Sequence, residues 1–255
     1  VADSTFYSLQ IDERRAELET LPFARGIVDL SAHQSDFLDA AGLKPESRRL
    51  IAEELAWADA FAAGAGARRQ PITLVLTDTH PGNFLIDARG KAVIVDLEKA
   101  LYGSPAIDLA HVSVYSSTTW DSDSSAELSV AEVAGFYRAY LIAAGPALAG
   151  ALHPWLVPMR RLLVLRALTW CAKWQVSHRQ AALPDKQAAV STEDWSAGNS
   201  DPALIAHVAG RVRDYLSPAT VARMLADWRG TPSLADLLEG GADGAALDAI
   251  WPQAE

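Results

Sequence analysis

Three short segments rich in β-branched and apolar residues, within a chain that otherwise reads as helical, limit most strongly how this sequence can fold. These segments are residues 72–76, 84–86 and 92–95, and their residue types favour strands. Residues 87–90, Asp-Ala-Arg-Gly, have the composition of a tight turn between two antiparallel strands. The pattern predicts a buried strand at 72–76, followed by a β-hairpin.

The segments on either side predict helices. Apolar residues recur at helical spacing over residues 46–63, and Gly64-Ala65-Gly66 then ends the pattern. Ser129 and Glu132 have the spacing of a capping box at the start of a helix that runs through Ala144. We therefore expect an α+β, mainly helical fold with a small β-hairpin inserted in it. Further helices are predicted from residue 106 onward and at 154–178, 202–215 and 218–228, and the chain from Gly230 is expected to be loosely packed.

The composition indicates which cellular environment and which binding partners suit this chain. The chain of 255 residues has 32 acidic and 22 basic residues, a formal net charge of −10. That charge would repel nucleic acid and anionic membrane surfaces, and it suits either a cationic substrate or a dispersed solubility charge. Cys171 is the single cysteine, which favours a reducing cytoplasm. The longest apolar run, 162–172, is too short to span a bilayer, so we expect a cytoplasmic protein with neither a membrane nor a nucleic-acid polymer as partner; its oligomeric state stays open.

The strands bring acidic and amide side chains together. Asp78 follows the first predicted strand, and Asn83 opens the second. The hairpin returns Asp96 to the same end. Such oxygen ligands suit Mg²⁺, and phosphoryl transfer needs a metal on the phosphates and a carboxylate that orients the attacking hydroxyl. Asp78 and Asn83 are also common turn residues, so a purely structural role stays open.

Three sequence blocks carry a resemblance to a known family. Asp78-x-His80-Pro81-x-Asn83 is similar to the catalytic loop of the aminoglycoside phosphotransferase and choline kinase-like family, which is related to the protein kinases. Asp96, after Ala-Val-Ile-Val, resembles the metal-binding Asp of that family. Residues 103–110 resemble the stretch that follows it, in which an Asp braces the active-site loops.

The resemblance implies the C-terminal catalytic lobe of a protein-kinase-like fold. It also implies an ATP-dependent, Mg²⁺-requiring phosphotransferase that transfers the γ-phosphoryl group to a hydroxyl of a small molecule, such as an aminoglycoside, a sugar or an amino alcohol. The nucleotide and that hydroxyl substrate would be its partners. By residue, it implies Asp78 as catalytic base, Asn83 and Asp96 as Mg²⁺ ligands, and Asp108 as structural support.

Further site residues are predicted with alternatives. His80 either contacts phosphate or substrate or stabilises its own loop. Glu98 is either near the metal or an ordinary carboxylate, and Asp108 could also cap a helix. Substrate-binding candidates after the Asp108 block, in what could equally be a polar surface loop, are Trp120, Asp121 and Asp123.

The predicted helix at 154–178 carries tryptophans and arginines at several positions. Its tryptophans could line the substrate pocket, but a core stripe is the expected role. Its arginines could bind an anionic group, but a solvated face is expected, and Cys171 is expected to be a buried, inert thiol. These residues are Trp155, Trp170 and Trp174, and Arg160, Arg161 and Arg166.

Two departures from the family pattern bear on activity. Leu76 stands where the family usually carries a His. Residues 1–70 lack a glycine-rich phosphate loop, and Lys44 is their first lysine, so we expect the N-terminal nucleotide lobe to be absent. The chain would divide into a helical lead-in at 1–70, the catalytic lobe at 71–230 and a tail at 231–255. A non-catalytic kinase-like module, a fragment that needs a nucleotide lobe, and a metal-dependent hydrolase are the alternatives.

Overall fold

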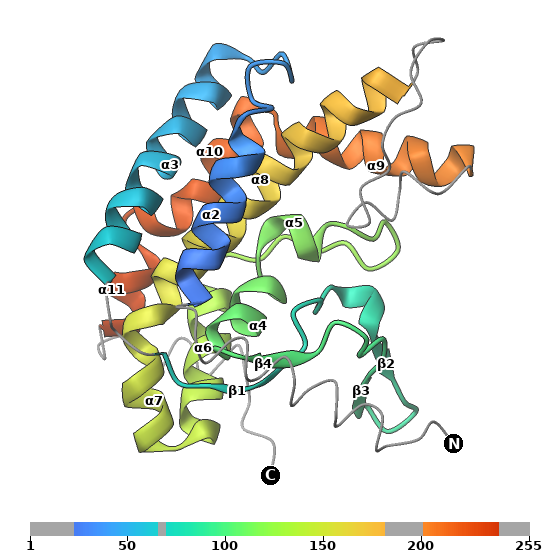
Figure 1. The fold of residues 1–255 in the computed structure, drawn as a ribbon. Helices are drawn as coiled ribbons and strands as arrows, with labels where there is room; N and C mark the ends of the chain where they lie inside the picture. The colour runs from blue at the N-terminus through green and yellow to red at the C-terminus, as the bar shows by residue number, and fades with distance from the viewer. Residues whose placement is uncertain (1–22, 66–69, 182–200, 240–255) are drawn as a thin grey trace.

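The computed structural model describes residues 23–65, 70–181 and 201–239, which form a helical body with short strands along one side (Figure 1). The expectations for residues 1–22 and 240–255 lie outside this part of the chain. The helices are α2 (Phe23–Ser35), α3 (Pro45–Ala65), α4 (Ala106–His111), α5 (Tyr115–Thr118), α6 (Val130–Ala144), α7 (Pro146–Leu152), α8 (Leu156–Ala181), α9 (Pro202–Tyr215), α10 (Pro218–Arg229) and α11 (Leu234–Glu239), with 3-10 turns η1 (Pro81–Asn83) and η2 (His153–Trp155).

The strands form two separate antiparallel pairs. Strand β2 (Phe84–Ile86) pairs with β3 (Ala92–Ile94), which confirms the predicted hairpin. Its turn ends at Gly90, whose φ of 80° suits a residue without a side chain. Strand β1 (Thr73–Val75) pairs with β4 (Leu101–Gly103), a strand that the sequence pattern did not predict. The second pair brings the chain back alongside the segment that precedes Asp78.

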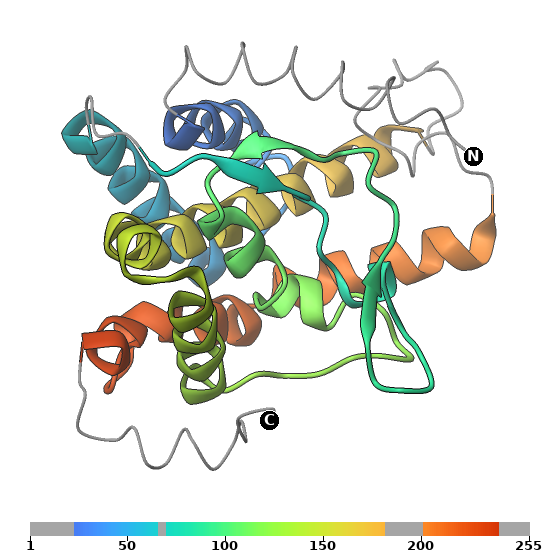
Figure 2. The ribbon, with the colours of Figure 1, turned by 90° about the horizontal axis from the view of Figure 1, so that it is seen from below.

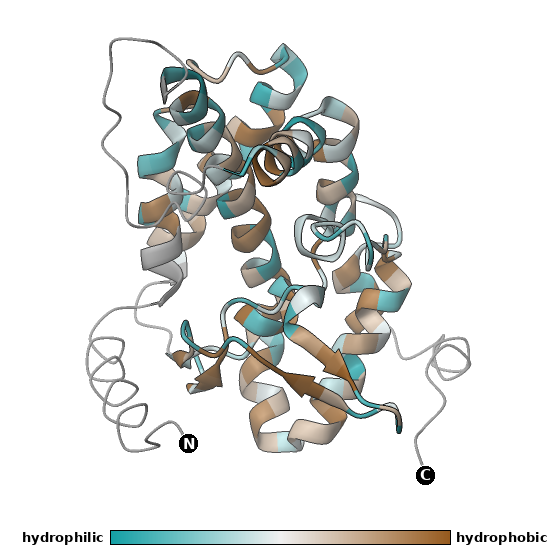
Figure 3. Ribbon diagram, turned by 90° about the vertical axis from the view of Figure 1, so that its right-hand side faces the viewer, coloured by the Kyte–Doolittle hydropathy of each residue, from teal (hydrophilic) through white to brown (hydrophobic). Residues whose placement is uncertain are grey.

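The expectation that the first strand is buried is wrong. Val75 is 1% exposed, but Ile72 and Leu74 are 47% and 52% exposed. Among the described residues, every strongly exposed large hydrophobic side chain except Ile142 lies between Ile72 and Leu97, and Figure 3 shows the strands as a hydrophobic band. A run of apolar residues predicts a strand, but it does not show whether another layer covers that strand.

Helix α8 forms the centre of the core. Figure 2 shows α8 running through the body between the strand side and the α9–α11 side. Trp155 and Trp174 are 7% and 5% exposed, which confirms their expected core positions, whereas Trp170 is only partly buried. Cys171 is buried as expected. Fully buried on or beside this helix are Leu152, Leu156, Met159, Leu162, Leu165 and Leu168.

Two arginines of α8 contradict the expectation of a solvated helix face. Arg160 is 2% exposed, and its Nε donates to Asp227 at 2.7 Å. Arg161 pairs with Glu54, which is itself 1% exposed. Because α8 is surrounded by other helices, Arg160 is turned toward the half-buried Asp227 and Arg161 toward the buried Glu54.

The ends of the other helices largely follow the sequence. The capping box at α6 is present, with Ser129 N donating to Glu132 Oε2 at 2.7 Å. Leu234 of α11 is fully buried, so the chain is packed as far as Glu239, and the expectation of a loose segment from Gly230 is wrong over that stretch. None of the described helices is long and apolar enough to cross a membrane.

Candidate active site

The backbone before Asp78 is held by Asp108. Leu76 N and Thr77 N donate to the two Asp108 carboxylate oxygens at 2.7 and 2.8 Å. Burial raises the pKa of Asp108, and these two hydrogen bonds oppose the rise. The alternative that Asp108 is a helix N-cap is wrong, because Pro105 occupies that position and Asp108 lies in the first turn of α4.

Thr77 is in an unusual conformation for a β-branched residue. Its φ of 62° is left-handed, a region that β-branched side chains strongly disfavour. Besides the Asp108 contact, its hydroxyl donates to the carbonyl of Lys99 at 3.0 Å. These bonds fix the turn that directs the next residue, Asp78, toward the pocket described below.

The loop after Asp78 is stabilised by its own side chains. His80 Nδ1 accepts from Gly82 N at 3.1 Å, so His80 caps η1. Asn83 is 6% exposed, and its Nδ2 donates to the Asp78 carbonyl at 2.8 Å. Its side-chain oxygen has no partner among the described residues. The loop therefore holds Asn83 with its amide nitrogen engaged and its oxygen available.

The hairpin carries Asp96 to the same place. Val95 N donates to the Asn83 carbonyl at 3.0 Å, so Asp96 follows directly after a contact with the Asp78 loop. Asp96 has a left-handed φ of 59° and an exposed side chain. Such backbone strain in a residue other than glycine clusters at functional sites.

Lys99 pairs with Asp78, which the sequence analysis did not predict. Its Nζ lies 2.5 Å from Asp78 Oδ2, with side-chain exposures of 52% and 22%. Burial acts to raise the pKa of Asp78, but the hydrogen bond and charge of Lys99 outweigh it and lower that pKa. Asp78 is therefore ionised at neutral pH. Lys99 follows Asp96 by three residues, and only the β3–β4 connection brings it back to Asp78.

His111 is a second residue that sequence reasoning missed. Burial, opposed mainly by the charge of Asp78, lowers its pKa from 6.5 to about 4, so it is neutral at pH 7. Its Nδ1 accepts from Thr79 N at 3.1 Å, which places the ring proton on Nε2. The sequence did contain a signal for His111: it lies three residues after Asp108, and residues three apart share a helix face, so His111 could have been expected near the same loop.

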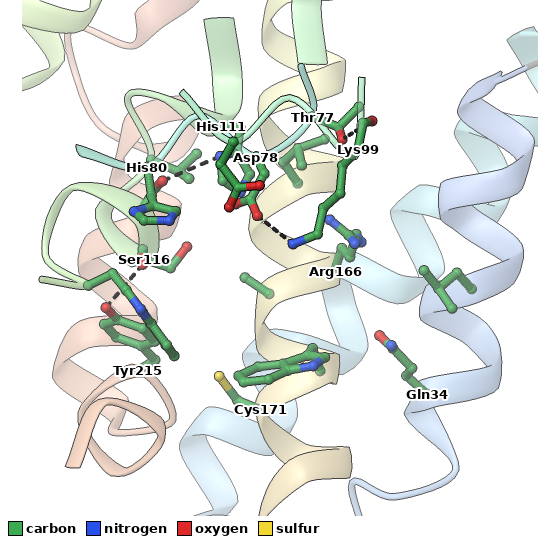
Figure 4. Close-up of a pocket in the computed structure, with 18 of the residues that line it drawn as sticks. Gln34, Thr77, Asp78, His80, Lys99, His111, Ser116, Arg166, Cys171 and Tyr215 are labelled. Atoms are coloured by element: carbon green, nitrogen blue, oxygen red, sulfur yellow. Dashed lines mark hydrogen bonds and ion pairs between the residues drawn. The ribbon is translucent and has the colours of Figure 1, made fainter. Parts of the chain in front are cut away.

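Most of the residues described above line a pocket of about 760 Å³ (Figure 4). Asp78, His80 and Asp96 reach it from the loops, and Trp120 reaches it from beyond α5. Asn83 and Asp108 do not line it but hold the loops behind it. Asp121 and Asp123 do not line it either; Asp123 N donates to Asp121 Oδ1 within their own turn.

Asp96 and Asn83 carry oxygen donors of the kind that Mg²⁺ takes beside phosphate, but of the two only Asp96 lines the pocket. Within the described part of the chain, no group of three or more His, Cys, Asp and Glu side chains could hold a metal ion. Asp96 offers a carboxylate, and Asn83 offers an amide oxygen whose partner nitrogen is already bonded. Mg²⁺ commonly takes one or two protein ligands and completes its shell with water and substrate phosphates.

Comparison with known proteins identifies the family. Searches of the curated proteins and of the solved structures returned no match. The profile of the phosphotransferase enzyme family matches residues 11–155. The match covers more than half of the 255 residues and includes the whole segment from Asp78 to Asp108 that carried the resemblance. It confirms the predicted resemblance: the chain belongs to the phosphotransferase enzyme family.

Proposed function

We propose that this protein transfers the γ-phosphoryl group of ATP to a hydroxyl of a small molecule, with Mg²⁺ as cofactor. One observation carries the proposal: Asp78 and Asp96, 18 positions apart in the chain, line the same pocket from two strained turns. Membership of a phosphotransferase family supports the reaction type. Two carboxylates held at one pocket wall suit a reaction whose catalysis is mainly positioning and charge stabilisation.

Each loop residue has a proposed role in that reaction. Asp78 orients the acceptor hydroxyl and receives its proton; its lowered pKa keeps it ionised before the reaction. Asp96 and the side-chain oxygen of Asn83 would hold Mg²⁺, which bridges and neutralises the nucleotide phosphates when bound. His80 stabilises the loop after Asp78, and Asp108 holds the turn before it.

The exposed strands favour a second candidate, a kinase-like lobe that needs a further nucleotide-binding segment. Most of the large apolar side chains between Ile72 and Leu97 are strongly exposed in the described structure, and exposed apolar surface is typical of an interaction face. Of the lysines in the described residues, only Lys99 lines the pocket. Under this candidate, ATP binding would require a second lobe that covers the strands.

Phosphoryl transfer can be tested directly. ADP formation from ATP and Mg²⁺ would be measured with a panel of hydroxyl compounds, for the wild-type protein and for Asp78→Asn. We expect the variant to lose at least about a hundredfold in rate, as is common when a positioned acid–base group is removed. Asp59→Asn, on the exposed face of α3, is the matched control and should retain the wild-type rate.

Either of two results would count against the first candidate. Turnover by Asp78→Asn at the wild-type rate would show that Asp78 does not serve the reaction. A lack of turnover that is restored by adding an ATP-binding partner domain would support the second candidate instead.

A further inference from the structure

The two sides of the pocket differ in charge. Its three carboxylates, Asp78, Asp96 and Glu98, all come from the loop side, where the proposed function uses the metal, the phosphates and the hydroxyl. Among the described residues, the helices α2, α5, α8 and α9 and the short turns next to them place no carboxylate in the pocket lining. The described residues of the helix side would therefore give an amino-rich acceptor no carboxylate to bind.

Aromatic rings form one wall of the helix side. The rings of Trp120 and Trp170 meet edge to face, with centroids 6.2 Å apart at an interplanar angle of 68°. Both line the pocket, together with Tyr215 and Leu163. Such a corner receives a flat or apolar body, because aromatic faces and edges contribute large contact areas at low entropic cost.

A hydrogen-bond donor from α2 faces the same space. Gln34 is 2% exposed yet lines the pocket. The single hydrogen of the Thr169 hydroxyl has two acceptors within reach, Gln34 Oε1 at 2.9 Å and the Arg166 carbonyl at 3.1 Å. In the shorter bond the hydroxyl donates to Gln34 Oε1, which leaves Nε2 as the donor that Gln34 can offer to a ligand. No acceptor for that donor exists in the described part of the chain.

The same side of the pocket also carries a guanidinium group. Arg166 of α8 lines the pocket, and its charge reaches the site, because it contributes to lowering the pKa of His111. Figure 4 shows Arg166 and Gln34 entering the pocket from neighbouring helices, on the side of the Lys99 amine. A guanidinium and an amide N–H that line one side of a pocket favour a carboxylate, because its two oxygens can accept a hydrogen bond from each.

Building on the proposed function, we propose that the acceptor is an alcohol with an apolar or aromatic body and one anionic group. Arg166 and Gln34 would bind the anion, the Trp120–Trp170 corner would receive the body, and the hydroxyl would point to Asp78. The net charge of −10 opposes an anion at long range, but salt screens exposed charges beyond about 8 Å. Contacts inside the pocket therefore decide the preference.

Three matched alcohols test this inference without nucleotide or metal. They are 4-(hydroxymethyl)benzoate, 4-(hydroxymethyl)benzylamine and 1,4-benzenedimethanol, which differ in one para substituent: an anionic carboxylate, a cationic aminomethyl group or a neutral hydroxymethyl group. Binding to the full chain would be measured by calorimetry and by tryptophan fluorescence. We expect the carboxylate to bind about tenfold or more tightly than the amine, the range of one charged hydrogen bond.

Variants tie the preference to named residues. Arg166→Met should abolish the preference for the carboxylate over the amine. Gln34→Glu, which keeps an acceptor for the Thr169 hydroxyl, should shift the preference toward the amine. Arg213→Met, on the exposed face of α9, is the control and should bind as the wild type does. Circular dichroism would verify that each variant is folded.

The inference is overturned if the amine binds as tightly as the carboxylate, if Arg166→Met keeps the preference, or if none of the three binds in the millimolar range. Because the assay contains neither ATP nor Mg²⁺, its result is independent of phosphoryl transfer. Amine preference together with Mg²⁺-dependent ATP binding would leave the proposed function standing and remove only this inference.

Discussion

Two residues beside the pocket, Thr77 and Asp96, adopt left-handed backbone conformations that glycine would adopt without strain. Thr77 directly precedes Asp78, the proposed base, and Asp96 is itself the proposed metal ligand. At Thr77, hydrogen bonds from the backbone to Asp108 and from the side chain to Lys99 hold the conformation. The structure thus uses local contacts to fix an unfavourable turn that aims Asp78.

Replacing Thr77 separates backbone strain from side-chain bonding. Thr77→Ala and Thr77→Gly both lose the hydroxyl, but only glycine relieves the left-handed strain. We expect Thr77→Gly to be more stable than Thr77→Ala by about 1 kcal/mol in urea unfolding. Equal stabilities would mean that position 77 is not left-handed in solution.

Asp108→Asn tests the clamp on the same turn. An amide presents one acceptor oxygen to two backbone donors, so one of Leu76 N and Thr77 N loses its partner. We expect a loss of about 1–3 kcal/mol of unfolding free energy. Asp59→Asn on an exposed helix face should change stability by less than about 0.5 kcal/mol, and an Asp108→Asn effect as small as that would contradict the clamp.

Lys99→Met tests the electrostatic control of Asp78. Removal of the ammonium leaves burial as the main influence, so the pKa of Asp78 should rise. A carboxyl-carbon NMR titration of Asp78 measures the rise, with Lys91→Met in the exposed hairpin turn as control. An unchanged pKa in Lys99→Met would show that the ion pair does not form in solution.

At this scale the sequence predicts the site only in part. That Asp78 and Asp96 lie at one pocket was predictable, because their spacing along a strand–loop–hairpin pattern is local, whereas Asn83 lies behind the pocket. Lys99 and His111 were not predicted, because their proximity to Asp78 depends on how β4 and α4 return to the loop. Asp121 and Asp123 were proposed from nearness in sequence, and they do not line the pocket.

At the scale of elements, helices and the hairpin were predictable while burial was not. Periodicity and caps indicated α3, α6, α9 and α10, and turn chemistry indicated the hairpin. Strand β4 is Leu-Tyr-Gly and lacks the β-branched residues that marked the predicted strands. The environment of Arg160 depends on which helices surround α8, and a single sequence does not contain that information.

A buried carboxylate joins three helices and gives a prediction about them. Glu54 of α3 is 1% exposed and pairs with Arg161 of α8 and Arg229 of α10. Glu54→Gln leaves two guanidinium groups without their shared counter-charge, so we expect a loss of about 3–5 kcal/mol. The neighbouring Glu53→Gln affects two exposed pairs, with Arg49 and with Arg229, and should cost less than about 1 kcal/mol. Chemical denaturation of both variants measures the difference, and equal effects would contradict the proposed link.

At the scale of the whole molecule, stability should depend on pH through His111. Its pKa is about 4 in the folded chain against a usual 6.5, so between these values the unfolded chain binds the proton and the folded chain does not. Stability therefore falls as pH decreases from about 6.5 to 4, by up to about 3 kcal/mol from this residue. His111→Gln, which does not titrate, should flatten the curve in that window. A steep fall that persists in the variant would assign the effect to other groups.

The whole-molecule claim is that loops from separate parts of the chain form one Mg²⁺–nucleotide site within a phosphotransferase family fold. Calorimetric titration with ATP, with and without Mg²⁺, for the wild type and Asp96→Asn tests it most directly. We expect Mg²⁺-dependent binding by the wild type that weakens at least about tenfold in Asp96→Asn, while Asp59→Asn binds as the wild type does. ATP binding that does not depend on Mg²⁺, or that Asp96→Asn retains in full, would contradict the claim.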